Sequence, residues 1–324
     1  MGIAIATAAF AFILGSMVYV YRVRGEERWA GVGEYVRKGW PIFTPFNCLL
    51  YLFTQKRARK PIMDVADFPE LADIQAEWET IRDEAVGLYQ QNAFEKAKDP
   101  ESSAYYDLGF RTFYKYGWSK FYLKWYGTEH RSAQATCPRT LEILRRCPRV
   151  KGAMFSILPV GGQLTRHADP AAASLRYHVG LATPNDDACF INIDGTSYSW
   201  RDGDALLFDE TYLHYARNDA QADRLILMCD VERPTWIVGR IVNFFYMLSM
   251  RATVVPNTEE DKRGLVNSIF SRLSPTVARV RTLKQTNPRR YRVIKWATNA
   301  LALLILAGLL IGAIYLLTLL IGML

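Results

Sequence analysis

Residues 189–200 read CFINIDGTSYSW, and this stretch decides the kind of fold to expect. Cys189–Ile193 and Thr196–Trp200 are short strand-like runs, and the Asp-Gly pair between them is typical of a tight β-hairpin turn. Similar runs bounded by turn residues lie on both sides: Ala153–Leu158, Leu175–Ala182, Ala205–Phe208 and Arg224–Val231. About eight such strands fit a double-sheet jelly roll. We therefore expect a mainly β core, a double-stranded β-helix or jelly roll, at residues 150–234.

Helical patterns flank this core. Apolar residues recur every three or four positions after Asp67, which predicts one buried face of a long helix. Further helices are expected at Thr140–Arg146 and Trp236–Met250. Residues 102–126 are crowded with aromatic side chains, which indicate core packing or a wall that faces an acyl chain. The predicted fold class is thus a β core with flanking α-helices.

Both ends of the chain lack charged residues. Residues 1–21 and 297–324 contain no Asp, Glu, Lys or Arg, and about 20 apolar residues are enough to span a bilayer. A cleaved signal peptide would begin with basic residues, whereas the first arginine here is Arg22, and a buried core helix is the other alternative. We expect one transmembrane helix at each end. The basic residues that flank both stretches then place residues 22–296 in the cytoplasm and both termini outside.

The composition narrows the classes of partner. A formal net charge of +8 occurs without any nucleic-acid recognition motif, so no nucleic-acid partner is expected and an anionic membrane surface is favoured. Trp40–Phe53 and Trp236–Met250 are too short to span a bilayer, and each either lies on its surface or packs on the body. Five cysteines without a C-x-x-C pair are expected to be reduced thiols that bind no zinc. No obligate protein partner is evident.

The candidate metal site consists of His167, Asp169 and His214. The imidazole and the carboxylate lie two residues apart and can reach one ion from a single strand end, while the second imidazole follows 45 residues later. Two histidines and one carboxylate leave three coordination positions open, as in non-haem Fe(II) oxygenases. A His-x-Asp pattern is also common by chance. However, three of the four histidines in the chain lie within one 48-residue stretch, which favours the metal site.

Arg224 extends this hypothesis to a cosubstrate. It lies ten residues beyond His214, at the start of an apolar run. A guanidinium group there is able to hold the far carboxylate of 2-oxoglutarate through two parallel hydrogen bonds. The residues by themselves thus predict an Fe(II) centre that uses 2-oxoglutarate and O2.

The stretch Met154–Pro234 resembles the aspartyl/asparaginyl β-hydroxylase family of Fe(II)/2-oxoglutarate oxygenases. The resemblance implies that His167 and His214 bind the iron. Animal members of the family have glycine where this chain has Asp169, so here the set of two histidines and one carboxylate is complete.

The same resemblance assigns roles to four more residues. It implies that Ser156, His178 and Arg224 contact 2-oxoglutarate. Arg176, in the run Leu175–Leu181, matches a position that contacts substrate in the family.

Within the family, the chain is most similar to the bacterial lipid A 2-hydroxylases. The similarity covers both terminal stretches and five further segments: residues 78–85, 122–126, 198–203, 208–212 and 229–234. It implies hydroxylation at C2 of a secondary acyl chain of lipid A, at the bacterial inner membrane. Three alternatives remain: the same chemistry on a protein Asp or Asn, another acylated lipid such as ornithine lipid, or a non-catalytic membrane-anchored binding module.

These inferences divide the chain into five parts. Residues 1–21 and 297–324 are the expected spans. Residues 22–66 form a juxtamembrane segment, residues 67–234 the cytoplasmic oxygenase domain, and residues 235–296 a basic, largely helical connector on the membrane surface.

Overall fold

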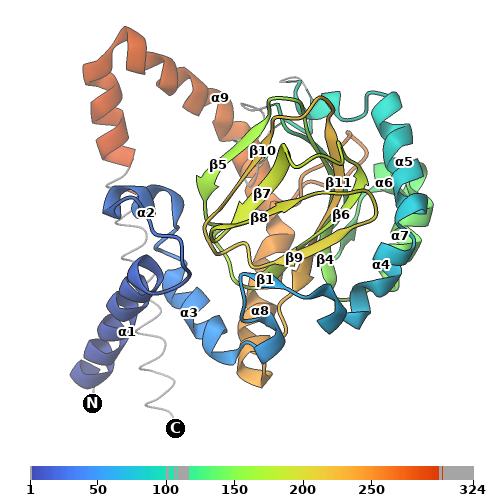
Figure 1. Ribbon diagram of the computed structural model, residues 1–324. Coiled ribbons are helices and arrows are strands. Elements are labelled where there is room, and N and C mark those ends of the chain that lie inside the picture. The colour runs from blue at the N-terminus through green and yellow to red at the C-terminus, as the bar shows by residue number, and fades with distance from the viewer. Residues whose placement is uncertain (1, 100–101, 106, 108–116, 299–300, 302–324) are drawn as a thin grey trace. The chain divides into compact units, whose positions relative to one another are not determined.

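Two antiparallel sheets face each other in the computed structural model (Figure 1), which describes residues 2–99, 102–105, 107, 117–298 and 301. The larger sheet has the strand order β1-β9-β6-β11-β4-β2-β3. In chain order, its strands are β1 Ile62–Met63, β2 Ser119–Trp125, β3 Thr128–Glu129, β4 Val150–Leu158, β6 Ser174–Ala182, β9 Ala205–Phe208 and β11 Arg224–Glu232. The smaller sheet, in the order β5-β10-β7-β8, consists of β5 Gln163–His167, β10 His214–Asn218, β7 Cys189–Ile193 and β8 Thr196–Ser199.

The alternation of side chains along each strand explains this arrangement. On β11, Ile226 and Met228 point into the space between the sheets, where they join Ile191 of the smaller sheet. Leu225 and Leu227 point the other way and belong to the core beneath the helices. The larger sheet is therefore buried on both faces, and the predicted β core is present.

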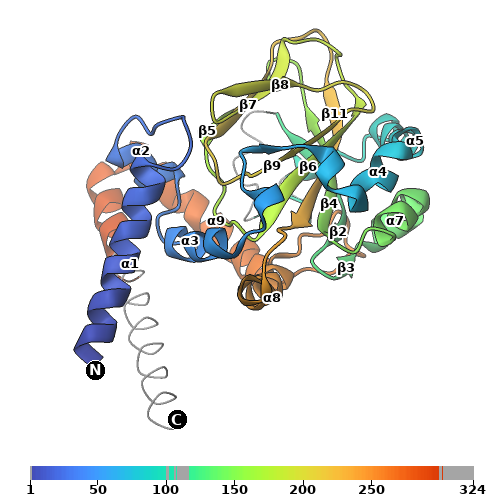
Figure 2. The same cartoon turned by 60° about the horizontal axis from the view of Figure 1, so that its bottom comes forward.

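Three helices cover the outer face of the larger sheet in both views (Figures 1 and 2): α4 Ala72–Ala76, α5 Trp78–Gln90 and α7 Pro138–Arg145. The single long helix expected after Asp67 is divided. A 3-10 turn at Pro69–Leu71 precedes α4, and the backbone of Glu77 (φ −103°, ψ 24°) leaves the helical region between α4 and α5. The predicted apolar face is nevertheless buried, with Ile74 and Ile81 both fully covered.

The remaining helices are α1 Gly2–Arg22, α2 Val32–Lys38, α3 Thr44–Phe53, α6 Arg131–Thr136, α8 Ile237–Met250 and α9 Leu265–Thr286. Short 3-10 helices lie at Lys56–Ala58, Val65–Asp67, Glu95–Ala97 and Arg251–Thr253. Residues 11–268 form one compact unit, and residues 1–10 and 269–324 form a second. The segment before the oxygenase domain belongs to the first unit and packs into it, because Trp29 and Tyr35 contact Ala168 and Leu213. The predicted boundaries of the five parts stay predictions.

The expectation of membrane spans requires correction. Within the described residues, every helix falls short of the length and apolar character that crossing a bilayer requires. Residues 2–22 do form one helix, but alanine, glycine, serine and threonine recur along it, and such residues add less to insertion than Leu, Ile or Phe. The span expected at 297–324 falls almost wholly outside the described residues. The expected location, in the inner membrane with both termini periplasmic, depended on these spans and is corrected with them.

Candidate metal centre

The smaller sheet brings the two candidate histidine ligands together. His214, at the start of β10, is paired with His167, at the end of β5, and their ring centroids are 4.3 Å apart. Asp169 follows β5 by two residues, and its backbone N–H donates to the carbonyl of Glu210 (2.8 Å). One potential ligand atom from each of the three side chains lies within 4.8 Å of the others.

Hydrogen bonds orient both imidazoles toward a common point. The Nδ1 atom of His167 lies 2.8 Å from the carbonyl oxygen of Thr165, and that of His214 lies 2.9 Å from the carbonyl oxygen of Tyr212. A carbonyl oxygen only accepts, so Nδ1 carries the proton in each ring and Nε2 keeps a free lone pair. This is the usual orientation of metal-bound histidines, whose second nitrogen donates to a backbone oxygen. The donor set therefore suits a divalent transition metal.

Arg176, on β6, lies at the centre of a group of carboxylates beside this site. Its guanidinium is paired with Asp169 (3.1 Å), Asp230 (2.6 Å) and Glu210. Burial raises the pKa values of the Glu210 and Asp230 carboxyls although the arginine opposes it. Arg176 thus pairs with Oδ2 of Asp169. This contact fixes the direction in which the other carboxylate oxygen, Oδ1, points toward His167.

Arg224 has a different environment. It is fully buried at the start of β11, and its guanidinium lies over the rings of Trp200 (4.4 Å) and Trp118 (4.9 Å). Its one side-chain hydrogen bond in the described chain is long, 3.4 Å from Nη2 to the hydroxyl of Ser156, while Nε and Nη1 have no hydrogen-bond partner there. Burial lowers its pKa to about 10, which still leaves the group charged at neutral pH.

His178 completes the site on the larger sheet. The indole N–H of Trp200 donates to its Nδ1 (3.4 Å), so the neutral ring carries its proton on Nε2, an atom that is buried without a partner among the described residues. Burial, aided by Arg224, holds the pKa of His178 well below its usual range, which keeps the ring neutral. Nε2 of His178 and the two free donors of Arg224 are thus placed to bind an anion with several oxygen atoms.

Every residue expected at the site lies at one narrow cavity of about 40 Å3, except Ser156, which touches it through Arg224. Ser156, Arg176, His178 and Arg224 come from the inner face of the larger sheet, and the metal-site residues come from the ends of β5 and β10. The sequence reasoning missed Glu210, Asp230, Trp118 and Trp200. Asp230 alone had a signal, since it interrupts the apolar run of β11 and a buried carboxylate there needs a partner.

A two-sheet β core with two histidines and one carboxylate at strand ends defines a class of metal-binding proteins. Comparison with known proteins gives the family. A sequence model of the aspartyl/asparaginyl beta-hydroxylase family matches residues 75–234. The chain belongs to this family of hydroxylases.

Three relatives indicate the range of the family. An ornithine lipid ester-linked acyl 2-hydroxylase from Rhizobium tropici is 30% identical over 193 residues, which are 59% of this chain and 67% of the relative. Human aspartyl/asparaginyl beta-hydroxylase is 29% identical over 169 residues, 50% of this chain and 21% of that protein. Human aspartate beta-hydroxylase domain-containing protein 2 is 35% identical over 126 residues, 36% of this chain and 34% of that protein. The chain therefore spans about two thirds of the bacterial relative and much less of the human ones.

Proposed function

We propose that this chain is an Fe(II)- and 2-oxoglutarate-dependent dioxygenase that hydroxylates C2 of an acyl chain of lipid A. The observation that carries the proposal is the convergence of His167, Asp169 and His214 beside a buried arginine, Arg224, two of whose nitrogens have no hydrogen-bond partner among the described residues. Iron, 2-oxoglutarate and O2, when bound, supply the chemistry that inserts oxygen into a C–H bond. The side chains of this protein bind and orient these groups and exclude water.

The metal-site residues support iron as the metal. Their two imidazole nitrogens and one carboxylate oxygen form the three-ligand set of non-haem iron oxygenases. Burial opposes ionisation of Asp169, but the positive charge of Arg176 beside it favours the carboxylate, and the pKa of Asp169 lies below its usual range, so the group is ready to bind a metal. Arg176 therefore acts here as a residue that positions Asp169, and a direct role in substrate binding stays a prediction.

Arg224 and its neighbours support 2-oxoglutarate as the cosubstrate. The free Nε and Nη1 donors of Arg224 suit the two oxygens of a carboxylate, and the hydroxyl of Ser156 offers a third contact. His178 donates from Nε2 within the same cavity. The cavity of about 40 Å3 has room for only a few atoms, so we expect its aromatic walls to move apart when the cosubstrate binds.

Two observations support a lipid as the substrate. The bacterial relative is named for hydroxylating an ester-linked acyl chain at C2. In addition, α3 and α8 contact each other and expose large apolar side chains to solvent: Phe46, Leu52, Ile237, Ile241, Phe244, Phe245 and Leu248. Groups of exposed apolar side chains on neighbouring helices are typical of interaction sites. Lys56 and Arg240 lie on or next to these helices, so an anionic lipid surface fits both the apolar face and its charge.

A protein substrate is the second candidate, and the human relatives named for Asp and Asn hydroxylation favour it. An ornithine lipid is the third, favoured by the name of the bacterial relative. All three share the metal centre and the Arg224 pocket, so only the product distinguishes them.

The decisive experiment is a mass spectrum of lipids extracted from cells that express the wild type or His214→Ala. Hydroxylation of lipid A adds one oxygen, about 16 Da by atomic mass, and the proposal requires this increment in the wild type alone. An increment on ornithine lipid instead would move the proposal to that lipid. If purified protein consumed 2-oxoglutarate while no lipid changed mass, a protein substrate would be favoured.

Asp169→Ala tests the ligand set separately. Because two imidazoles alone hold Fe(II) poorly in a three-ligand site, we expect the fold to survive and turnover of 2-oxoglutarate to be lost. Asp187→Ala, which removes an exposed carboxylate away from the site, is the matched control. Full turnover in Asp169→Ala would exclude this residue as a required ligand and leave the histidines in place.

A further inference from the structure

A second cavity, of about 530 Å3, lies on the other side of the turn between β9 and β10 from the metal centre. Within this turn, Asp209 faces the second cavity, whereas the next residue, Glu210, faces Arg176 and the metal centre. The volume lies within the range of about 300–1,000 Å3 that is usual for small-molecule sites. Neither the proposed iron ligands nor the 2-oxoglutarate residues line this cavity.

The walls of the second cavity are mostly apolar and come from α1 and α3. Phe12, Gly15 and Tyr19 contribute from α1, and Tyr51 and Leu52 from α3. Leu52 is 64% exposed, so the cavity reaches the surface next to the apolar face of α3. Walls of this kind suit a hydrocarbon chain better than a polar metabolite.

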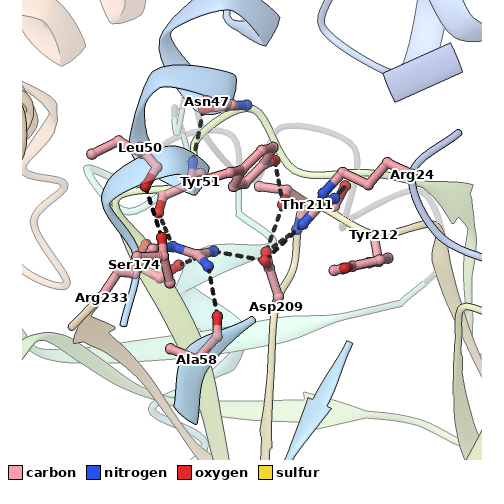
Figure 3. Close-up of polar contacts among 12 residues, drawn as sticks. Arg24, Asn47, Leu50, Tyr51, Ala58, Ser174, Asp209, Thr211, Tyr212 and Arg233 are labelled. Carbon is pink, nitrogen blue, oxygen red and sulfur yellow. Dashed lines mark hydrogen bonds and ion pairs between the residues drawn. The ribbon is translucent and has the colours of Figure 1, made fainter. Parts of the chain in front are cut away.

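Two arginines and one carboxylate form an ion-pair cluster in the lining of the cavity. Arg24 and Arg233 approach Asp209 from two sides, and each lies 2.8 Å from the same carboxylate oxygen (Figure 3). Arg24 also donates to the carbonyl of Thr211 (2.9 Å) and lies over the ring of Tyr212 (3.6 Å). One carboxylate thus pairs with two buried guanidinium groups, which leaves one excess positive charge in the cluster. Burying this charge costs free energy unless an anion binds nearby.

A third arginine lies at the rim. Arg59 donates from Nε to the carbonyl of Thr54 (2.8 Å), and both residues line the cavity. Arg59 is exposed. Among the residues that line the cavity there are three arginines and a single acid, Asp209. The residues that line the cavity therefore suit a ligand with a hydrocarbon part and an anionic part.

We propose that this cavity binds the phosphate-bearing part of the lipid substrate, with an acyl chain between α1 and α3 and phosphate oxygens at Arg59. The inference rests on the proposed function and deepens it, because an excess of two positive charges favours a phosphorylated lipid over a zwitterionic one. The part of the lipid that does not react is then held one turn away from the metal centre. Binding energy from such remote parts is what positions the reacting chain.

The first test is a calorimetric titration of the full chain, without iron or 2-oxoglutarate, with three probes. These are octyl phosphate, octyl glucoside and inorganic phosphate, each below its micelle concentration where it has one. We expect octyl phosphate to bind at least about tenfold more tightly than either of the others, because it alone satisfies both the walls and the arginines. Equal binding of octyl glucoside would overturn the anionic part of the proposal, and equal binding of inorganic phosphate would overturn the acyl part.

Two pairs of variants locate the binding. Arg59→Ser should raise the Kd for octyl phosphate about tenfold. Lys60→Ser removes the same charge from the next residue, which does not line the cavity, and should change this Kd less than twofold. Gly15→Leu fills the cavity, since a Cβ there meets no atom within 4 Å. Its control is Gly87→Leu, in α5, where a Cβ is equally free but Gly87 does not line this cavity. Unchanged binding in both Arg59→Ser and Gly15→Leu would overturn the site.

This titration separates the two proposals because it requires no turnover. Octyl phosphate binding with the expected losses, in a protein that hydroxylates no lipid, would support the site and refute the lipid substrate. Lipid hydroxylation with an unchanged KM in Arg59→Ser and Gly15→Leu would refute the site and leave the proposed function in place.

Discussion

Arg224 and Arg233 are both buried to about 1% exposure or less, yet they lie in regions with opposite character. Arg233 is saturated: it pairs with Asp209 and donates to the carbonyls of Ala58, Ala172 and Ser174 (Figure 3). Arg224 has one long contact with a hydroxyl and otherwise lies against indole rings.

The difference between the two arginines shows that the effect of a buried charge on stability depends on its hydrogen-bond and ion-pair partners. A saturated guanidinium such as Arg233 ties distant segments together, here the end of β11 to the chain before β1. A guanidinium whose donors stay free among the described residues, such as Arg224, costs stability unless a ligand completes it. The comparison therefore distinguishes a structural arginine from a binding one without reference to any relative, and four predictions can break or sharpen it.

The largest expected effect is on stability. Arg233→Met should lower the free energy of unfolding by about 3–5 kcal/mol, because it leaves Asp209 with one arginine fewer and three carbonyls unpaired. Arg224→Met should change it by less than about 1 kcal/mol, because it removes a buried charge that has no charged partner among the described residues. Urea unfolding of both variants measures the contrast. Equal losses would show that the two environments do not differ in the way proposed.

The second effect concerns 2-oxoglutarate. Arg224→Lys should raise the apparent KM for 2-oxoglutarate by about 100-fold, since a point charge cannot replace the planar fork. Arg201→Lys, at an exposed ion pair with Asp187, is the control and should change little. If Arg224→Lys kept the wild-type dependence on 2-oxoglutarate, another basic group would carry the contact, and Arg176 would be the next candidate.

The sequence predicted which residues lie together at the candidate site better than it predicted the strands that carry them, while the chemistry of the site stays a prediction. The metal-site residues and Arg224 were recognisable because few residue types make such a set, and β7 was predicted to the residue. The strands that carry the histidines were missed, because β5 (QLTRH) and β10 (HYARN) are polar and only partly covered, without the apolar alternation that indicates a strand. Polar strands are what a site at the mouth of the fold requires.

Two other features were beyond sequence reasoning for different reasons. Strand β2 lies in an aromatic run whose residues are buried on both faces, so its pattern does not distinguish a strand from a buried helix. The cluster of Arg24, Asp209 and Arg233 joins residues 185 positions apart, and spacing along the chain holds no information about such a contact. The uncharged N-terminal stretch is the opposite case. Its pattern was clear, but among the described residues no helix is long and apolar enough to cross a bilayer.

The third effect is a pH dependence of the same contrast. Burial opposes ionisation of Asp209, but Arg233 and Arg24 outweigh it and hold its pKa below the usual range. A carboxyl with a lowered pKa stabilises the fold above its unfolded pKa of about 3.9, and this contribution is lost as the pH falls further. The stability gap between wild type and Arg233→Met should therefore stay level from pH 7 to about pH 4 and narrow below it. The gap for Arg224→Met should show no such narrowing, and a matching decrease there would imply a carboxylate partner for Arg224.

The smallest expected effect tests whether Ser156 and Arg224 act on one ligand. Ser156→Ala removes a single neutral contact, so the apparent KM for 2-oxoglutarate should rise only about two- to fivefold, with stability nearly unchanged. If the hydroxyl and the guanidinium hold the same carboxylate, their effects depend on each other, because the carboxylate is no longer fixed once the fork is lost. Ser156→Ala should then raise the KM by a smaller factor in the Arg224→Lys variant than it does in the wild type. If the fold-changes in KM of the two variants simply multiplied, Ser156 would act on a separate part of the site. Arg224 would then bind a ligand group that Ser156 does not contact.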